Sequence, residues 1–197
     1  MADLDRKRPW KVVQSRYAVA DRWLRLRRDD VTLPDGRTFT AYPVIEHPDW
    51  VDMIALTADL DVVLVDQYRH PVRKVRTEFP AGMVDDGEEP LAAGKRELLE
   101  ETGYASNEWH LLGIAPVYPS LQTNRIYSFL ALNAHCVAEQ ELDEGELIRA
   151  YELPFPDFLD KVQWGALELP ALQLAGLWWL WARLTGRGIT GTLIPFF

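Results

Sequence analysis

The chain has 197 residues, of which 48% are hydrophobic and 26% are charged, and its formal net charge is −9. This length suits one domain, or a domain with a small subdomain, and the composition is ordinary for a soluble protein. The negative charge argues against general binding of nucleic acids or anionic membranes. It would also repel a phosphate-bearing substrate unless bound cations reversed the local field.

Cysteine content and apolar segments narrow the class of protein further. Cys136 is the one cysteine of the sequence, so we expect no internal disulfide, no zinc site built from thiols, and a reducing cytoplasmic location. The charged start, MADLDRKRPW, lacks the apolar core of a signal peptide. The most apolar run, residues 169–184, contains Pro170 and Arg183 and is short for a membrane span, so it predicts a buried or interface helix.

The first quarter of the chain predicts strands only. Residues 10–20 and 22–33 show partial alternation with β-branched side chains, and the turn signal Pro34-Asp35-Gly36 leads into residues 37–47. We therefore expect a β-meander, and we assign residues 1–47 to an N-terminal β subdomain. Exposed strands of this kind often pair with a second subunit, so we expect this part to serve dimerisation.

Residues 48–197 form the predicted main domain. Two strands, 50–58 and 61–69, precede a loop at 78–89. Pro90 suits the first turn of a helix that follows, and Gly103 suits the position just past its end. Further strands are expected at 108–118, 125–135 and 146–154, and helices at 156–163 and 169–184. Strands on both sides of a central helix predict a mixed α/β (α+β) sandwich.

Three carboxylates gather near the end of the predicted helix at residues 90–102. Glu97, Glu100 and Glu101 share one face, where like charges oppose each other by about 0.2–0.5 kcal/mol per pair. The helix dipole also disfavours anions in the last turn. A solvated acidic face is one interpretation. The other is a site for Mg²⁺ or Mn²⁺, because both cations prefer carboxylate oxygens. Glu88 precedes the helix, and an ion pair between Glu88 and Arg96 would brace the loop against it.

The stretch GMVDDGEEPLAAGKRELLEETGY, residues 82–104, resembles the Nudix box, G-x5-E-x7-R-E-U-x-E-E-x-G-U, in which U is bulky and apolar. Every fixed position matches, and the last U is the aromatic Tyr104. The resemblance implies a mixed-sheet α/β/α sandwich, in which a loop–helix–loop binds Mg²⁺ or Mn²⁺, and hydrolysis of a nucleoside diphosphate linked to another group. It implies that the metal is held by the carbonyl of Ala81 and by Glu97, Glu100 and Glu101. It gives Glu88 and Arg96 a structural role.

Other segments are similar to the branch of this family that cleaves ADP-ribose and nucleotide sugars. They are RWLRLRRDDVTLPDGR, VLVDQYRHP and TEFPAGMVDDGE, together with Pro119, which falls fifteen residues after the box. The similarity implies cleavage of ADP-ribose or a related nucleoside diphosphate sugar to NMP and sugar phosphate, in a homodimer with shared active sites. Ser120 and Asn124 depart from the glycine and the acid that are common in ADP-ribose enzymes, so the identity of the sugar stays open.

The same similarity proposes three further site residues. Arg69 matches a phosphate-contacting arginine, although a solvated strand end or a flexible charged loop over residues 67–76 explains the basic residues as well. Glu78 matches an acidic position near the substrate. The general base is expected from the acidic loop 139–150, with Glu144 as first and Glu146 as second candidate. An acidic surface loop without function is the alternative.

The catalytic candidates are therefore Glu97, Glu101 and Glu144. A non-catalytic module that senses a nucleotide is the alternative function, and the intact box favours the enzyme.

Overall fold

The computed structural model describes residues 9–185, and most of the charged start of the chain lies outside them. Backbone contacts divide the chain into two units. The described residues up to Pro48 form the first together with Pro116–Arg125, and Asp49–Ala115 with the described residues from Ile126 form the second. Within residues 9–185, no helix is long and apolar enough to cross a membrane.

The first unit is an antiparallel meander. Its strands β1 (Lys11–Ala20), β2 (Arg25–Thr32) and β3 (Thr38–Glu46) pair in the order β1-β2-β3. Gly36, at φ 86°, forms the turn between β2 and β3, where a positive φ is easiest for glycine. The loop at 116–125 joins β3 through two backbone bonds, from Ile45 N to Leu121 O (2.8 Å) and from Thr123 N to Ile45 O (3.1 Å).

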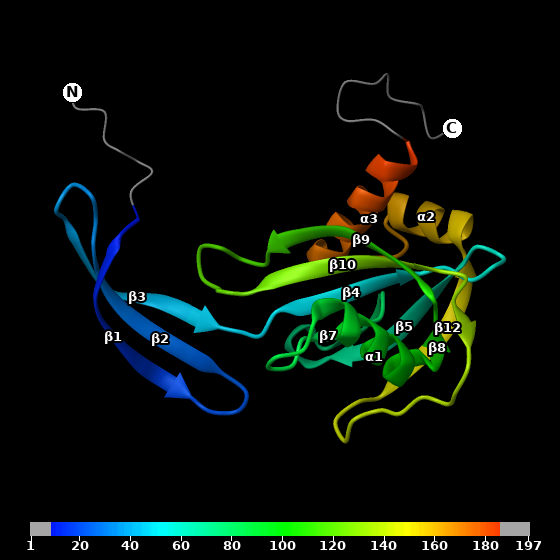
Figure 1. The fold of residues 1–197 in the computed structure, drawn as a ribbon, viewed down its shortest axis with the longest axis horizontal. Coiled ribbons are helices and arrows are strands. Elements are labelled where there is room, and N and C mark those ends of the chain that lie inside the picture. Colours follow the sequence, from blue (N-terminus) through cyan, green and yellow to red (C-terminus); the bar gives the residue numbers. More distant parts are fainter. Residues whose placement is uncertain (1–8, 186–197) are drawn as a thin grey trace. The chain divides into compact units, whose positions relative to one another are not determined.

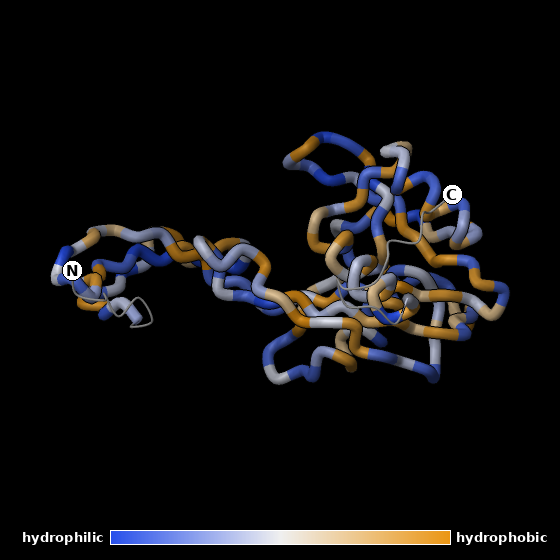
Figure 2. Tube along the Cα trace, turned by 90° about the horizontal axis from the view of Figure 1, so that it is seen from above, coloured by the Kyte–Doolittle hydropathy of each residue, from blue (hydrophilic) through white to orange (hydrophobic). Residues whose placement is uncertain are grey.

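The meander carries apolar side chains that its own strands do not cover. Every residue of β1 is exposed, and hydrophobic residues recur along the strands of this unit (Figure 2). Trp23 is 76% exposed, and Trp10, Tyr17 and Phe39 are each about half exposed. A three-stranded sheet without a covering layer buries little apolar surface by itself.

The second unit contains two larger sheets and a short ribbon (Figure 1). One sheet has the order β7-β4-β10-β9, from β4 (Trp50–Ala55), β7 (Ala81–Met83), β9 (Glu108–Pro116) and β10 (Arg125–Leu132), with β4 parallel to β10 and antiparallel to β7. The other is the antiparallel sheet β12-β5-β6, from β5 (Asp61–Arg69), β6 (Lys74–Glu78) and β12 (Ile148–Pro154). The ribbon pairs β8 (Tyr104–Ala105) with β11 (His135–Cys136).

Helices cover both faces of these sheets. The helix α1 (Pro90–Thr102) packs through Ala93 and Leu98 on one side, in a cluster with Val51, Met53 and Val63. On the other side lie α2 (Phe155–Gln163) and α3 (Ala171–Leu184), whose buried Phe158 and Leu180 join a second cluster. Successive residues of a strand face opposite sides, so β4 supplies both clusters. The predicted mixed α/β class is confirmed.

Two segments differ from the sequence prediction. The loop expected at residues 78–89 contains β7, and the basic stretch 67–76 contains the end of β5, a short 3₁₀ helix η1 (His70–Val72) and most of β6. The interpretation of that stretch as a flexible loop is wrong. The β6 sequence, KVRTE, alternates charged and uncharged residues at the edge of its sheet, where charged side chains are tolerated and a strand pattern is hard to recognise.

The helix α1 has the bounds that its sequence predicts. Pro90 lies in the first turn, and Gly103 follows the last residue with a left-handed φ of 75° and donates its N–H to Leu99 O at 2.7 Å. A side chain at Gly103 would place its Cβ 2.1 Å from the carbonyl oxygen of Ala138. Glycine is therefore required both for the backbone conformation and for the close approach of the following chain.

One carboxylate is buried beneath α3, away from the acidic helix face. Asp52, on β4, is 1% exposed, and neither of its carboxylate oxygens makes a hydrogen bond of normal geometry with a described residue. A Cβ on Gly176 of α3 would come within 3.6 Å of this carboxylate, so α3 approaches it closely. Burial raises the pKa of Asp52 from 3.8 to about 7, and the nearby Ser128 hydroxyl offsets part of this shift.

We expect Asp52→Asn to become stabilising as the pH rises. Because the folded pKa is raised, the contribution of Asp52 to stability is fully present below the unfolded pKa and is lost as the pH rises through about 7. The free energy of unfolding of the variant, relative to the parent, should therefore rise by on the order of 1–4 kcal/mol between pH 4 and pH 8. Urea unfolding across this range measures it.

The matched control is Asp59→Asn, the same change at an exposed turn residue. Its difference from the parent should stay small across this range, because the side chain is exposed. A pH-independent difference for Asp52→Asn as well would contradict the assignment of a raised pKa to Asp52.

Candidate active site

The last two turns of α1 bring Glu97 against the loop that β7 begins. A Cβ built on Gly82 would lie 2.0 Å from Cδ of Glu97, so the carboxylate group of Glu97 rests on the glycine backbone. Glycine at position 82 is what lets this carboxylate reach the strand. Burial raises the pKa of Glu97, repulsion from Glu100 and Glu146 adds to the shift, and Arg96 opposes it.

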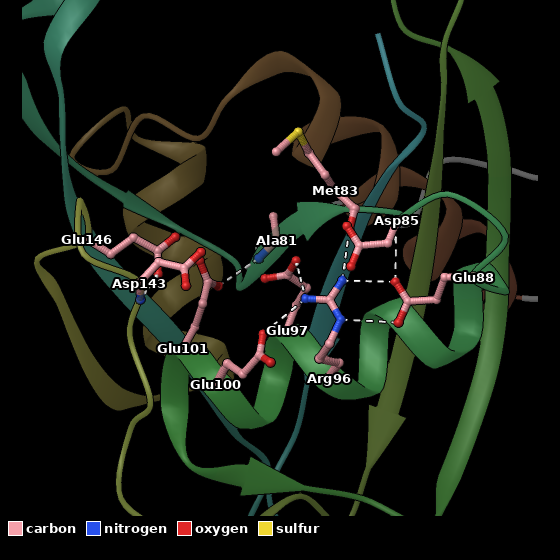
Figure 3. A network of polar contacts seen from close by, with 10 residues as sticks. All are labelled: Ala81, Met83, Asp85, Glu88, Arg96, Glu97, Glu100, Glu101, Asp143 and Glu146. Carbon is pink, nitrogen blue, oxygen red and sulfur yellow. Dashed lines mark hydrogen bonds and ion pairs between the residues drawn. The ribbon is translucent and has the colours of Figure 1, made fainter. Parts of the chain in front are cut away.

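Glu101 is the most buried of the three helix carboxylates, with 4% of its surface exposed. It accepts a hydrogen bond from the backbone N–H of Ala81 at 2.9 Å (Figure 3). Met53 N donates to Pro80 O, so the pairing of Ala81 with Asp52 is a non-hydrogen-bonded one, and the N–H and C=O of Ala81 lie outside the β4–β7 ladder. Burial raises the pKa of Glu101 to about 8, and Glu97 and Glu146 contribute further.

Arg96 links the loop to the acidic face of α1 (Figure 3). It donates from Nε and Nη2 to Glu88, at 3.1 and 2.9 Å, and from Nη2 to the carbonyl of Met83 at 3.0 Å. Its Nη1 donates to Glu97 at 2.9 Å and to Glu100 at 3.0 Å. The Arg96 guanidinium thereby lowers the pKa of Glu88 and fixes the loop on the helix.

The donor set fits a divalent cation in its chemistry. In residues 9–185, no three His, Cys, Asp or Glu side chains form a closed metal-binding group, because Arg96 holds Glu97 and Glu100 while Ala81 holds Glu101. The raised pKa values of Glu97 and Glu101 show that burial penalises their negative charge. A cation would offset that penalty, and carboxylate and carbonyl oxygens are the ligands that Mg²⁺ and Mn²⁺ prefer.

The acidic loop before β12 is tied to the end of α1. Gln140 donates from its side-chain amide to the carbonyls of Glu101 and Ile148, and Glu141 N donates to Glu100 O at 2.9 Å. These bonds carry Glu146 to the glutamate cluster, where it acts on the pKa values of Glu97 and Glu101 (Figure 3). The sequence gives no local sign of this role of Gln140, because both of its side-chain bonds are to backbone carbonyls, those of Glu101 and Ile148.

The two loop acids differ in their surroundings. Glu146 is half-buried, and its Oε2 accepts a hydrogen bond from Asp143 N at 3.1 Å. Glu144 is exposed, and none of the raised pKa values in the cluster has Glu144 among its causes. Of the two candidates for the general base, the structure therefore brings Glu146, the second, to the cluster.

Arg69 and Glu78 bind each other across the β5–β6 pair. Arg69 donates from Nε to Oε1 of Glu78 at 3.1 Å and from Nη2 to Oε2 at 2.7 Å, a two-pronged ion pair. The side chain of Glu78 is 6% exposed and that of Arg69 is 42% exposed. Glu78 first, and then Glu101 and Glu146, raise the pKa of Arg69, so this cation lies within electrostatic reach of the glutamate cluster.

Comparison with known proteins gives two domain matches. The pattern of the NUDIX domain matches residues 47–172, and the nucleoside diphosphate sugar hydrolase N-terminal domain matches residues 10–45. A protein named methanol dehydrogenase activator, from Bacillus methanolicus, is 32% identical over 157 residues, which is 78% of this chain and 83% of that protein. A protein named ADP-ribose pyrophosphatase, from Bacillus subtilis, is 30% identical over 154 residues, with the same coverage.

A solved structure shares the fold. The crystal structure of a protein described as an ADP compounds hydrolase superimposes with a TM-score of 0.79 and covers 92% of this chain and 97% of its own. The sequence identity is 20%, so this likeness bears on the fold alone.

Proposed function

The chain belongs to the Nudix hydrolase family, and from this premise we propose that it hydrolyses the diphosphate of a nucleoside diphosphate sugar, with ADP-ribose as first candidate. The products would be a nucleoside monophosphate and a sugar phosphate. The observation that carries the proposal is the cluster of Glu97, Glu100 and Glu101 on α1, in which Glu97 and Glu101 contact the Ala81–Gly82 backbone and Arg96 holds Glu100. The N-terminal domain match and the Bacillus subtilis relative favour a nucleotide-sugar substrate.

The family uses divalent metal ions, and we propose Mg²⁺, with Mn²⁺ as the alternative. Glu97, Glu100, Glu101 and the carbonyl of Ala81 would hold it, since these oxygens lie together at the end of α1 and beside it. When bound, such an ion neutralises charge on the diphosphate and lowers the pKa of a water molecule. The ion pair between Arg96 and Glu88 would hold the loop in position on the helix.

The remaining site residues act on the water and on the phosphates. We propose that the Glu146 carboxylate takes the proton from the water that attacks phosphorus, in preference to Glu144, because Glu146 is the loop acid near Glu97 and Glu101. Arg69 would contact a phosphate oxygen with the exposed part of its guanidinium. Both oxygens of Glu78 are engaged by Arg69, so Glu78 would orient that arginine rather than touch the substrate.

A substrate panel tests the function directly. Purified protein is incubated with ADP-ribose, ADP-sugars and GDP-mannose at millimolar Mg²⁺ or Mn²⁺, and the products are separated by anion-exchange chromatography. Formation of a monophosphate and a sugar phosphate from at least one compound is expected. Binding without cleavage of any compound would favour the alternative, a nucleotide-sensing module, which no observation on the site supports at present.

We also propose that the chain forms a homodimer through its first unit. The support is the apolar surface that β1 and its neighbours leave exposed, including Trp10, Tyr17 and Trp23. Size-exclusion chromatography with light scattering should give a mass of twice 22.6 kDa. A mass of one chain at micromolar concentration would contradict the dimer.

A further inference from the structure

A second recess lies in the same unit as the glutamate cluster, on the opposite face of a sheet. Its volume is about 620 Å³, and its lining comes from the β12-β5-β6 sheet, from α2 and from the connection between α2 and α3. Asp66 and Leu64 face this side of β5, whereas Val63 and Val65 face α1. Figure 1 shows α1 and α2 on the two sides of this sheet. The recess is therefore separate from the proposed active site.

The floor of the recess is a fixed polar network. Asp66 accepts a hydrogen bond from the Thr77 hydroxyl at 2.6 Å and a longer one from the Tyr151 hydroxyl at 3.4 Å. The Thr77 and Tyr151 hydroxyls are themselves 3.3 Å apart. Asp66 is thus engaged by neighbours from β6 and β12, and its charge is partly spread over their hydroxyl groups.

The rim of the recess carries an excess of positive charge. Arg76 donates to the carboxylate of Glu168 at 2.6 Å and to its carbonyl at 3.2 Å. This ion pair forms one wall of the recess. Arg149 lies over the ring of Tyr151, with its guanidinium carbon 5.4 Å from the ring centre. Within residues 9–185, neither Arg149 nor Lys161 has an ion-pair partner. The chain as a whole has a net charge of −9, so two such cations at one recess give this surface a charge opposite to that of the protein.

We propose that this recess binds a small phosphate-bearing metabolite through Arg149 and Lys161. The volume lies in the range of about 300–1000 Å³ that is usual for small-molecule sites. The planar guanidinium of Arg149 suits two oxygens of a phosphate, and Lys161 adds a point charge. Val75, Leu153 and Leu167 supply an apolar wall for the rest of the ligand. This binding does not depend on the hydrolytic function.

Titration of the full chain with inorganic phosphate, followed by two-dimensional ¹H–¹⁵N NMR, tests the proposal. The titration is done in the presence of EDTA, and chloride at equal ionic strength controls for general salt effects. We expect saturable shifts of the backbone amides at residues 149–151 and 161–168. Shifts confined to α1 and the region of Arg69, or shifts that chloride reproduces, would overturn the proposal.

Four variants separate the recess from the active site. Arg149→Ala and Lys161→Ala should each weaken phosphate binding at residues 161–168 by about tenfold, since a charge-assisted contact is lost. Lys95→Ala, a charge-matched change at an exposed position of α1, and Arg69→Ala should leave it unchanged. If Arg149→Ala or Lys161→Ala does not fold, Arg149→Gln and Lys161→Gln replace it. Equal affinity in the parent and all recess variants would refute the site.

Discussion

Glu101→Gln should lower kcat/KM by roughly 10³-fold or more, equivalent to about 4 kcal/mol of transition-state stabilisation. The change keeps the size of the side chain and an oxygen that can accept the Ala81 N–H bond, but it removes the carboxylate that would bear a negative charge against a bound cation. Loss of that charge weakens the hold on the cation and with it the neutralisation of the diphosphate. Steady-state kinetics over a range of Mg²⁺ concentrations measure the effect.

The matched control is Glu89→Gln, the same change one residue before α1. Glu89 is exposed, and its side chain forms no capping bond with the helix. This variant should keep the parental kcat/KM, and circular dichroism should be the same for both variants. Parental activity in Glu101→Gln would remove the central residue from the proposed mechanism, whereas a loss in both variants would point to a general effect of charge on α1.

Glu146→Gln should lower kcat by about 10²–10⁴-fold, the usual contribution of a general base. The amide cannot accept a proton from water, although it still offers an oxygen to Asp143 N. Because chemistry rather than substrate contact is removed, KM should change little. Steady-state kinetics of the parent and the variant measure both constants.

Glu144→Gln is the comparison that separates the two loop acids. Its side chain is exposed, so we expect the variant to retain activity within a factor of about two. The opposite pattern, with Glu144→Gln inactive and Glu146→Gln active, would return the role of base to Glu144. Full activity in both variants would exclude this loop as its source.

Local patterns in the sequence were sufficient for most of the fold. The bounds of α1 follow from Pro90 and Gly103, because a proline in the first turn and a left-handed glycine after the last are requirements of the helix itself. The strands β4 and β5 are predicted from their apolar, β-branched runs, which are typical of strands buried on both faces. The strands β6 and β7 are not predicted, since β7 has three residues and charged side chains of β6 find their partners in other elements, at Arg69 on β5 and at Glu168.

The site residues also differ in how far the sequence alone predicts their positions. Spacing alone puts Glu97, Glu100 and Glu101 on one helix face, because the helix period fixes it. The choice between Glu144 and Glu146 depends on bonds from Gln140 and Glu141 to the end of α1, which are 39 and 41 residues apart in sequence (140 − 101 and 141 − 100). The pairing of Glu78 with Arg69 likewise needs the register of β5 and β6.

Gln140 has a further consequence for the acidic loop. Its single amide group holds the carbonyls of both Glu101 and Ile148, so it works as a clasp that closes residues 141–147 into a ring fastened to the helix. These bonds fix both ends of the segment and so lower its conformational entropy. The seven residues between the fixed ends limit how far the segment can extend. Substitutions at the exposed tip should therefore be tolerated more readily than a change in the number of residues, which would alter how far Glu146 extends over the helix.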